Sequence, residues 1–319
     1  MINTKSSIVH RKYSVLAIAI ALVAVVGAAC ASDTNSTPDD ATVVTTTTYP
    51  LTFISERIGG DRISVTQLVK PGVEAHDFEP SPSDARAIYE SDLFIYNHPA
   101  FESWALNAAA ASSGDNENLT VTVQTVNLEL VGEDHGRQEH VHSTLDAHVW
   151  LNPLEAQKQA DRILSALTEV DPDGSQIYTR NADALDIELR ALDELIAAQL
   201  TNCDLDDVVV SHLAFGHMAE RYGFHQIGLA ELSPEFESGP SQITTVIEKI
   251  DELGINHILQ EPIVSDRLAE TVSAETGAQL LVLHPLAVRT SDEASQGLSY
   301  IDIMKRNADA LGTAMACAG

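Results

Sequence analysis

Basic residues are scarce in this sequence. Its 319 residues include 18 lysines and arginines against 47 aspartates and glutamates, a formal net charge of −29 at pH 7. No basic patch is present. A field of this sign repels nucleic acid and anionic lipid, and it attracts cations only weakly and without specificity. Nucleic acid and anionic membrane surfaces are therefore excluded as partners. Solubility in an extracellular setting is the simplest explanation of the acidity, and concentration of cations is the alternative.

Cysteine is also rare, with three in the chain. Their spacing fits no thiolate metal site. Cys203 and Cys317 remain as an even pair after export processing, and in an oxidising compartment we expect a disulfide between them. Two unpaired thiols are the alternative.

The N-terminal 29 residues have the pattern of an export signal. Three basic residues precede an apolar run over residues 14–29, which is too short to favour a spanning helix and ends in small residues. Two processing routes are open. Residues 27–30 resemble a lipobox, in which Cys30 is lipidated, although Gly27 replaces the usual branched aliphatic residue. Alternatively, residues 29–31 fit an A-x-A site of ordinary signal peptidase, and Cys30 is removed.

This signal predicts an extracytoplasmic protein. With Cys30 lipidated, the chain is anchored at the cell membrane and touches it through the lipid alone. With ordinary cleavage, it is soluble in the periplasm or secreted. Residues 30–40 are rich in Ser, Thr, Asn, Asp and Pro, which is typical of a flexible tether.

From residue 41 onward, strand-like and helix-like runs alternate, which predicts parallel sheets flanked by helices. The length suits two domains, and we expect two α/β lobes, over residues 41–152 and 203–319. Residues 153–202 are predicted to be helical. Within them an apolar stripe at three- and four-residue steps over 175–200 predicts a long, rigid connecting helix. The predicted strands are 43–49, 63–69, 93–96, 121–126, 208–210, 226–229, 257–260 and 279–283, and the predicted helices include 51–58, 101–111, 153–169, 175–200, 214–222, 243–253, 267–276 and 298–311.

Four histidines lie near expected strand ends, namely His76, His148, His212 and His284. Ligands of open α/β sheets collect outside the carboxyl ends of strands, and neutral imidazole is a good ligand for zinc and its neighbours. Because two of the four come from each half, facing lobes would bring them to one cleft. We therefore expect a metal site between the lobes, and the candidate residues around its ligands are Asp77, Glu79 and Glu261.

The remaining histidines are weaker candidates. His225 and His257 precede their strands, His217 is expected on a helix and facing elsewhere, and His98 follows a strand. A short acidic loop contains three more, which either capture metal for the deeper site or are simply solvated: His135, His140 and His142.

Three motifs together resemble a known family. They are Lys-Pro-Gly at 70–72 with His-Asp-Phe-Glu-Pro-Ser at 76–81, Asp-Ala-His-Val-Trp-Leu-Asn-Pro at 146–153, and Ser-His-Leu-Ala-Phe-Gly at 211–216 with Arg-Tyr-Gly at 221–223. The pattern is similar to the metal-binding solute receptors of bacterial ABC importers (cluster A-I), and within them to the zinc-type, ZnuA-like proteins. Glu-Pro at 261–262 and Glu-Thr-Gly at 275–277 fit as well. The resemblance runs from about residue 41 to the C-terminus.

The resemblance implies a binding protein without enzymatic activity. Such a receptor, here expected to be a monomer, holds a divalent metal between its lobes and delivers it to a membrane permease driven by a cytoplasmic ATPase. His76, His148 and His212 occupy the family's ligand positions, and histidine at the third position favours zinc over manganese. At the fourth position the family normally has aspartate before Pro-Leu, whereas this chain has His284. Four imidazoles would shift selectivity further from Mn²⁺ toward Zn²⁺, Cu²⁺ or Ni²⁺; three ligands plus water, with His284 merely nearby, is the alternative.

Two other functions compete with this prediction. Three histidines plus water also describe a zinc hydrolase, but no H-E-x-x-H motif occurs and a fourth protein ligand would close the site. A surface adhesin-type lipoprotein with incidental metal binding would differ only in its partner.

Overall fold

The computed structural model describes residues 41–112, 121–124, 146–230, 240–263 and 267–318, which belong to one compact unit. The expected signal, tether and lipidation site at Cys30 lie outside these residues, as do His135, His140 and His142. Among the described helices, none is both long and apolar enough to cross a bilayer.

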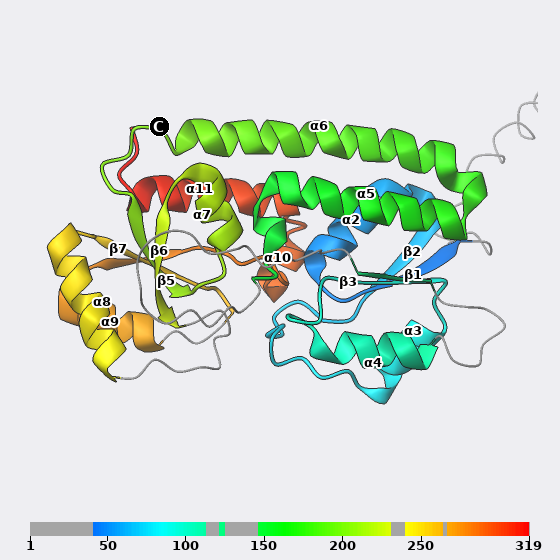
Figure 1. Cartoon of the computed structure of the whole chain (residues 1–319), viewed down its shortest axis with the longest axis horizontal. Coiled ribbons are helices and arrows are strands. Elements are labelled where there is room, and N and C mark those ends of the chain that lie inside the picture. Colours follow the sequence, from blue (N-terminus) through cyan, green and yellow to red (C-terminus); the bar gives the residue numbers. More distant parts are fainter. Residues whose placement is uncertain (1–40, 113–120, 125–145, 231–239, 264–266, 319) are drawn as a thin grey trace, which may run out of the picture. The chain divides into compact units, whose positions relative to one another are not determined.

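The first half of the chain forms a four-stranded parallel sheet with strand order β2-β1-β3-β4 (Figure 1). Its inner strand β3 is buried along its whole length, as expected for an apolar strand covered on both faces. The elements are β1 (Thr42–Thr46), α2 (Tyr49–Gly59), η1 (Gly60–Arg62), β2 (Ile63–Gln67), α3 (Pro82–Tyr89), β3 (Leu93–Tyr96), α4 (Ser103–Ser112) and β4 (Val121–Gln124).

The second half repeats this arrangement, with a parallel sheet in the order β6-β5-β7-β8. In both sheets the chain starts at an inner strand, adds the next strand on one side and then continues on the other. The elements are β5 (Asp207–His212), α7 (Gly216–Tyr222), β6 (His225–Ala230), α8 (Pro240–Leu253), β7 (His257–Gln260), α9 (Arg267–Thr276), β8 (Gln279–Val282), α10 (Ser291–Ser295) and α11 (Tyr300–Ala314).

A helical segment connects the two halves. It follows η2 (Val149–Leu151) and contains α5 (Pro153–Val170), η3 (Pro172–Gly174) and the 25-residue helix α6 (Ser175–Gln199). Helix α6 packs against α5 of the same segment, against α2 of the first half and against α11 of the second (Figure 1). The predicted apolar stripe is the buried face of α6 and consists of Leu185, Leu189, Leu192 and Ile196. Burial of each of these side chains contributes about 1.5–3 kcal/mol to the stability of the fold. The predicted two-lobe α/β fold with a long connecting helix is confirmed.

Side-chain contacts join the end of α6 to the second lobe. Asp193, which is buried on α6, accepts hydrogen bonds from the Arg221 guanidinium at 2.8 and 2.6 Å and from the Tyr222 hydroxyl at 3.1 Å. Just beyond the helix, Cys203 and Cys317 are joined by a disulfide. The connecting helix is thus held to α7 and to the C-terminal end of the chain.

Two local differences from the predicted elements have clear causes. Strand β1 ends at Thr46, three residues early, because Thr48 is the N-cap of α2 and Pro50 lies in that helix's first turn. Helix α10 was not predicted, although its capping box, Thr290 with Glu293 three residues later, is visible in the sequence.

Candidate metal centre

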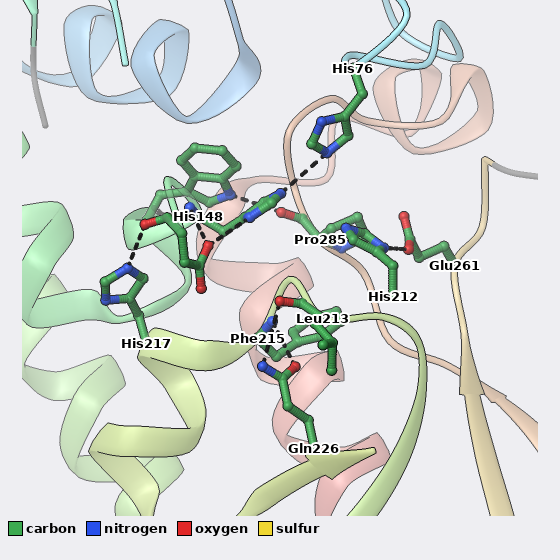
Figure 2. A network of polar contacts seen from close by, with 11 residues as sticks. His76, His148, His212, Leu213, Phe215, His217, Gln226, Glu261 and Pro285 are labelled. Atoms are coloured by element: carbon green, nitrogen blue, oxygen red, sulfur yellow. Dashed lines mark hydrogen bonds and ion pairs between the residues drawn. The ribbon is translucent and has the colours of Figure 1, made fainter. Parts of the chain in front are cut away.

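Three of the expected ligands meet in the structure. His76, His148 and His212 each offer a ring nitrogen, and these nitrogens all lie within 4.8 Å of one another. The Nε2 atoms of His76 and His148 are 3.4 Å apart (Figure 2). Tetrahedral ligands at a Zn–N distance of about 2.0–2.1 Å lie about 3.3 Å apart. The observed separation therefore suits two imidazoles bound to one zinc ion.

Strand order explains how His212 reaches this place. His212 is the last residue of β5, and Glu261 directly follows β7, the neighbouring strand. Strands β5 and β7 flank the point where the order of the second sheet reverses, and ligands of doubly wound sheets bind outside the carboxyl ends of strands at such a point. His212 and Glu261 are consequently brought together across this edge.

The other two histidines come from the first half of the chain. His76 lies in the loop after β2, and His148 immediately precedes η2. The Phe101 ring packs edge-on against both imidazoles, with centroid distances of 4.5 Å to His76 and 5.3 Å to His148. This apolar contact limits how far either ring can turn.

Asp146 orients the ring of His148. Its Oδ1 atom lies 2.8 Å from His148 Nδ1 and accepts the His148 backbone N–H at 2.9 Å. Burial opposes the ionisation of Asp146, but hydrogen bonds from His148 outweigh it and lower the pKa of this carboxyl. With Nδ1 bound to the carboxylate, His148 Nε2 is left to face His76.

Glu261 orients His212 in the same way. Its carboxylate contacts Nδ1 of His212, and both side chains are buried (Figure 2). Burial works against protonation of His212, but Glu261 outweighs it and raises the pKa of the ring. The second ring nitrogen of His212, Nε2, is buried and has no hydrogen-bond partner among the described residues. Such an atom is costly unless something binds it.

His76 has a different environment. Burial, together with the nearby His148 and His212 rings, lowers the pKa of His76 to about 2. The ring is therefore neutral at physiological pH, and a neutral imidazole has a lone pair for a metal ion.

The cavity at the three rings also contains carboxylates. Glu74 and Glu261 line it together with the three histidines and apolar residues such as Ile263 and Val288. Glu74 accepts the His76 backbone N–H at 3.1 Å, and burial raises the pKa of Glu74. Carboxylates beside the rings favour a cation there, since burying an uncompensated ion is expensive.

His284 lies outside this group, contrary to the four-ligand expectation. Its Nε2 is 3.0 Å from Glu293 Oε2, and its Nδ1 accepts the Leu286 N–H at 2.9 Å. The reason is local, because both ring nitrogens of His284 are engaged by residues of its own lobe.

Of the three residues expected around the ligands, one belongs to the site and two do not. Glu261 joins the site through His212, whereas Asp77 and Glu79 are exposed. His217 was expected to face elsewhere; instead its Nε2 lies 2.9 Å from the Asp146 carbonyl oxygen. Asp146, Glu74 and His217 were missed as site residues. Asp146 and Glu74 had one shared signal, since each stands two residues before a candidate ligand.

The match to known proteins covers nearly the whole described chain. Residues 44–314 match the model of the family described as "Zinc-uptake complex component A periplasmic", ZnuA. This chain belongs to the ZnuA family. Members of this family are binding proteins that work with ABC transporter permeases, so the resemblance predicted from the three motifs is confirmed.

Two named members of the ZnuA family are similar to this chain in sequence. The high-affinity zinc uptake system protein ZnuA of Bacillus subtilis (strain 168) is 33% identical over 306 residues, which cover 93% of this chain and 95% of the relative. The zinc-binding lipoprotein AdcA of Streptococcus pneumoniae is 31% identical over 276 residues, 84% of this chain. This chain spans about half, 54%, of the length of AdcA.

Solved structures show the same fold. The Zn(II)-bound ZnuA-like domain of Streptococcus pneumoniae AdcA superposes with a TM-score of 0.74 at 28% identity, covering 86% of this chain and 99% of the domain. A second match is the laminin-binding protein Lmb of Streptococcus agalactiae, described as bifunctional with adhesin and metal-transporting activity. Its TM-score is 0.74 at 27% identity, and the match covers 86% of this chain and 99% of Lmb. The named ZnuA and AdcA relatives are zinc-uptake and zinc-binding proteins, not enzymes.

Proposed function

We propose that this protein captures one zinc ion between its two lobes and delivers it to the permease of an ABC importer. The observation that carries the proposal is the convergence of three buried or half-buried imidazoles, from His76, His148 and His212, on one point. Two of these rings have a carboxylate behind Nδ1, the arrangement that orients metal-binding histidines.

The donor set favours zinc over manganese. Imidazole nitrogen suits Zn²⁺, Cu²⁺ and Ni²⁺, whereas Mn²⁺ prefers carboxylate, carbonyl and water oxygen. Zinc is further supported by the names of the relatives. The proposal assigns three protein ligands rather than four, since both ring nitrogens of His284 have other partners.

The permease, the anchor and the oligomeric state belong to the same proposal. We infer that a monomer docks on the permease, that lipidated Cys30 holds it at the membrane, and that the lobes comprise residues 41–152 and 203–319 on either side of the helical segment 153–202. Membership of the ZnuA family supports docking on a permease, and the name of AdcA as a lipoprotein supports the lipid anchor.

Isothermal titration with zinc and, separately, manganese tests the metal assignment. The purified protein should bind one zinc ion tightly and manganese far more weakly. His76→Ala, His148→Ala and His212→Ala should each abolish tight zinc binding, while His225→Ala, on an exposed ring at the start of β6, should not. Stoichiometric binding that survives all three site substitutions would refute the proposal.

Adhesion is a second candidate function, favoured by the likeness to the laminin-binding protein Lmb. Zinc capture and adhesion would use the same fold with different partners. Binding of the purified protein to immobilised laminin, with albumin as the negative surface, tests this candidate. Retention on laminin no greater than on albumin would exclude it and leave the zinc proposal intact.

A further inference from the structure

The segment that follows β8 crosses from the second lobe to the first. We call residues 284–290 the crossing segment. Three of its carbonyl oxygens accept hydrogen bonds from first-half or connecting residues: Pro285 from Trp150 Nε1 at 2.8 Å, Ala287 from Tyr49 N at 2.9 Å, and Arg289 from Gly72 N at 2.8 Å. This part of the second half is therefore bonded to three separate elements outside its own lobe.

Two of the three donors stand close in sequence to proposed ligands. Gly72 lies four residues before His76, and Trp150 lies two residues after His148. Three members of the crossing segment, Pro285, Ala287 and Val288, line the metal cavity itself. The segment is thus both a wall of the cavity and a bridge to the elements that carry the first-half histidines.

Gly72 lies tightly against the end of the segment. It has a φ of +81°, a region that L side chains rarely adopt. A Cβ atom at this position would lie 3.0 Å from the Ser291 hydroxyl oxygen. The loop before His76 therefore has little freedom to shift relative to α10.

His284 holds the first end of the crossing segment. Its Nδ1 accepts the N–H of Leu286, a non-glycine residue with a φ of +63°. Because a backbone N–H is always a donor, Nδ1 is the acceptor of the neutral ring and Nε2 has the proton. Nε2 then donates to Glu293 at 3.0 Å. Asn307 bonds both the N–H and the C=O of His284, each at 2.8 Å.

Glu293 holds the other end. Its Oε2 atom, which accepts from His284, also accepts the backbone N–H and the hydroxyl of Thr290, both at 2.9 Å. In return, Thr290 Oγ1 accepts the Glu293 N–H at 3.1 Å. One carboxylate oxygen thus joins the first and last residues of the crossing segment.

We propose that His284 and Glu293 are positioning residues that fix both ends of the crossing segment, hold the first-lobe histidines against the second lobe and so slow metal release. This inference rests on the proposed function, because it assumes that zinc occupies the site. It assigns His284 a role in retaining the metal without making it a ligand.

The test compares zinc release from the full chain and from three variants. Glu293→Gln and His284→Gln each weaken the contact between the two side chains, and Glu270→Gln, on an exposed residue of α9, is the charge-matched control for the first. Zinc dissociation is followed by stopped flow with a chromogenic chelator in excess. Association rates are measured separately, and the absorption spectrum of the Co²⁺-loaded protein reports the ligand set.

We expect Glu293→Gln and His284→Gln to release zinc about tenfold faster, since hydrogen bonds to charged groups are among the stronger ones. Association rates and the Co²⁺ spectrum should stay as in the unsubstituted protein, and so should every property of Glu270→Gln. The double variant should release zinc no faster than the faster single variant, because the two side chains act as one unit.

Two results would overturn the inference. If the variants have lower melting temperatures but unchanged zinc release, the contact is only structural. If His284→Gln changes the Co²⁺ spectrum and Glu293→Gln does not, His284 is a ligand. Should His284→Gln fail to fold, Glu293→Gln alone decides through its release rate. Absence of saturable zinc binding by the unsubstituted protein would instead refute the proposed function, which is a different outcome.

Discussion

Asp146 contacts His148 twice through the same carboxylate oxygen, which lies 2.8 Å from ring Nδ1 and 2.9 Å from the backbone nitrogen. The carboxylate therefore sets both the position of the residue and the direction of its ring. Behind Asp146, His217 contacts the aspartate's carbonyl oxygen at 2.9 Å. A chain of contacts thus runs from α7 through Asp146 to a proposed metal ligand.

Removing the charge of Asp146 should weaken metal binding. In Asp146→Asn the amide can still contact His148, but the negative charge behind Nδ1 is lost, so we expect zinc affinity to fall by about 10–100-fold. Competition titration with a chelator of known affinity measures this. Asp183→Asn, on an exposed residue of α6, is the matched control. Equal affinities for the two variants would mean that Asp146 has no influence on the metal.

A methyl group on Gly216 should act on the same carboxylate. A Cβ atom there would lie 2.7 Å from Asp146 Oδ2, closer than real Cβ contacts, so the aspartate must move away and its contact with His148 must lengthen. We expect Gly216→Ala to lower zinc affinity about tenfold, in line with other losses of such partners. Gly312→Ala, whose Cβ would meet nothing closer than 3.9 Å, should bind zinc normally. Unchanged affinity in Gly216→Ala would contradict the positioning role of Asp146.

Glu102 should make stability depend on pH. It is buried between Thr47 and Asn97, and burial raises its pKa from 4.5 to about 7. The folded protein thus binds this proton more tightly than the unfolded chain does. The resulting stabilisation is complete below about pH 4.5 and is lost as pH rises through about 7.

The neutral variant Glu102→Gln should lack this dependence. Between pH 4.5 and 8, the free energy of unfolding of the unsubstituted protein should fall relative to that of Glu102→Gln by on the order of 3 kcal/mol. Urea unfolding at several pH values measures the difference, and Glu252→Gln, on an exposed residue of α8, should show none. A difference that is constant with pH would show that Glu102 ionises normally.

The bond between Cys203 and Cys317 closes a loop with a sequence separation of 114 residues. Cross-links over long loops restrict the unfolded chain, so the double substitution to serine should lower the free energy of unfolding by about 2–4 kcal/mol. Thermal unfolding with and without reductant measures this. Reductant should lower the melting temperature of the unsubstituted protein and leave the variant unaffected; identical melting of both proteins under oxidising conditions would contradict the prediction.

Much of the fold followed from sequence patterns because they are local. β-branched and apolar runs bounded by turn residues located all eight strands of the described residues, and the leucine stripe of α6 has its expected place in the core. The end of β1 was misjudged because threonines 45–48 suit a strand by propensity. The turn into α2 depends on the cap at Thr48 and on Pro50.

The metal site was partly predictable for the same reason. Position after a strand identified His76 and His212, and it also made His284 a weaker candidate, because the sequence does not show the contacts of its ring with Leu286 and Glu293. The partners of the ligands depend on tertiary contacts. The reach of His217 to Asp146 spans 71 residues of sequence, and that of Glu261 to His212 spans 49.

The central claim is that His76, His148 and His212 hold one zinc ion. Crystals of the zinc-loaded protein, measured above and below the zinc absorption edge, test it most directly. We predict one strong anomalous peak that vanishes below the edge, about 2.0–2.1 Å from a nitrogen of each of the three rings, with His284 still bonded to Glu293. A peak elsewhere, or one bound by fewer than three of these histidines, would contradict the account.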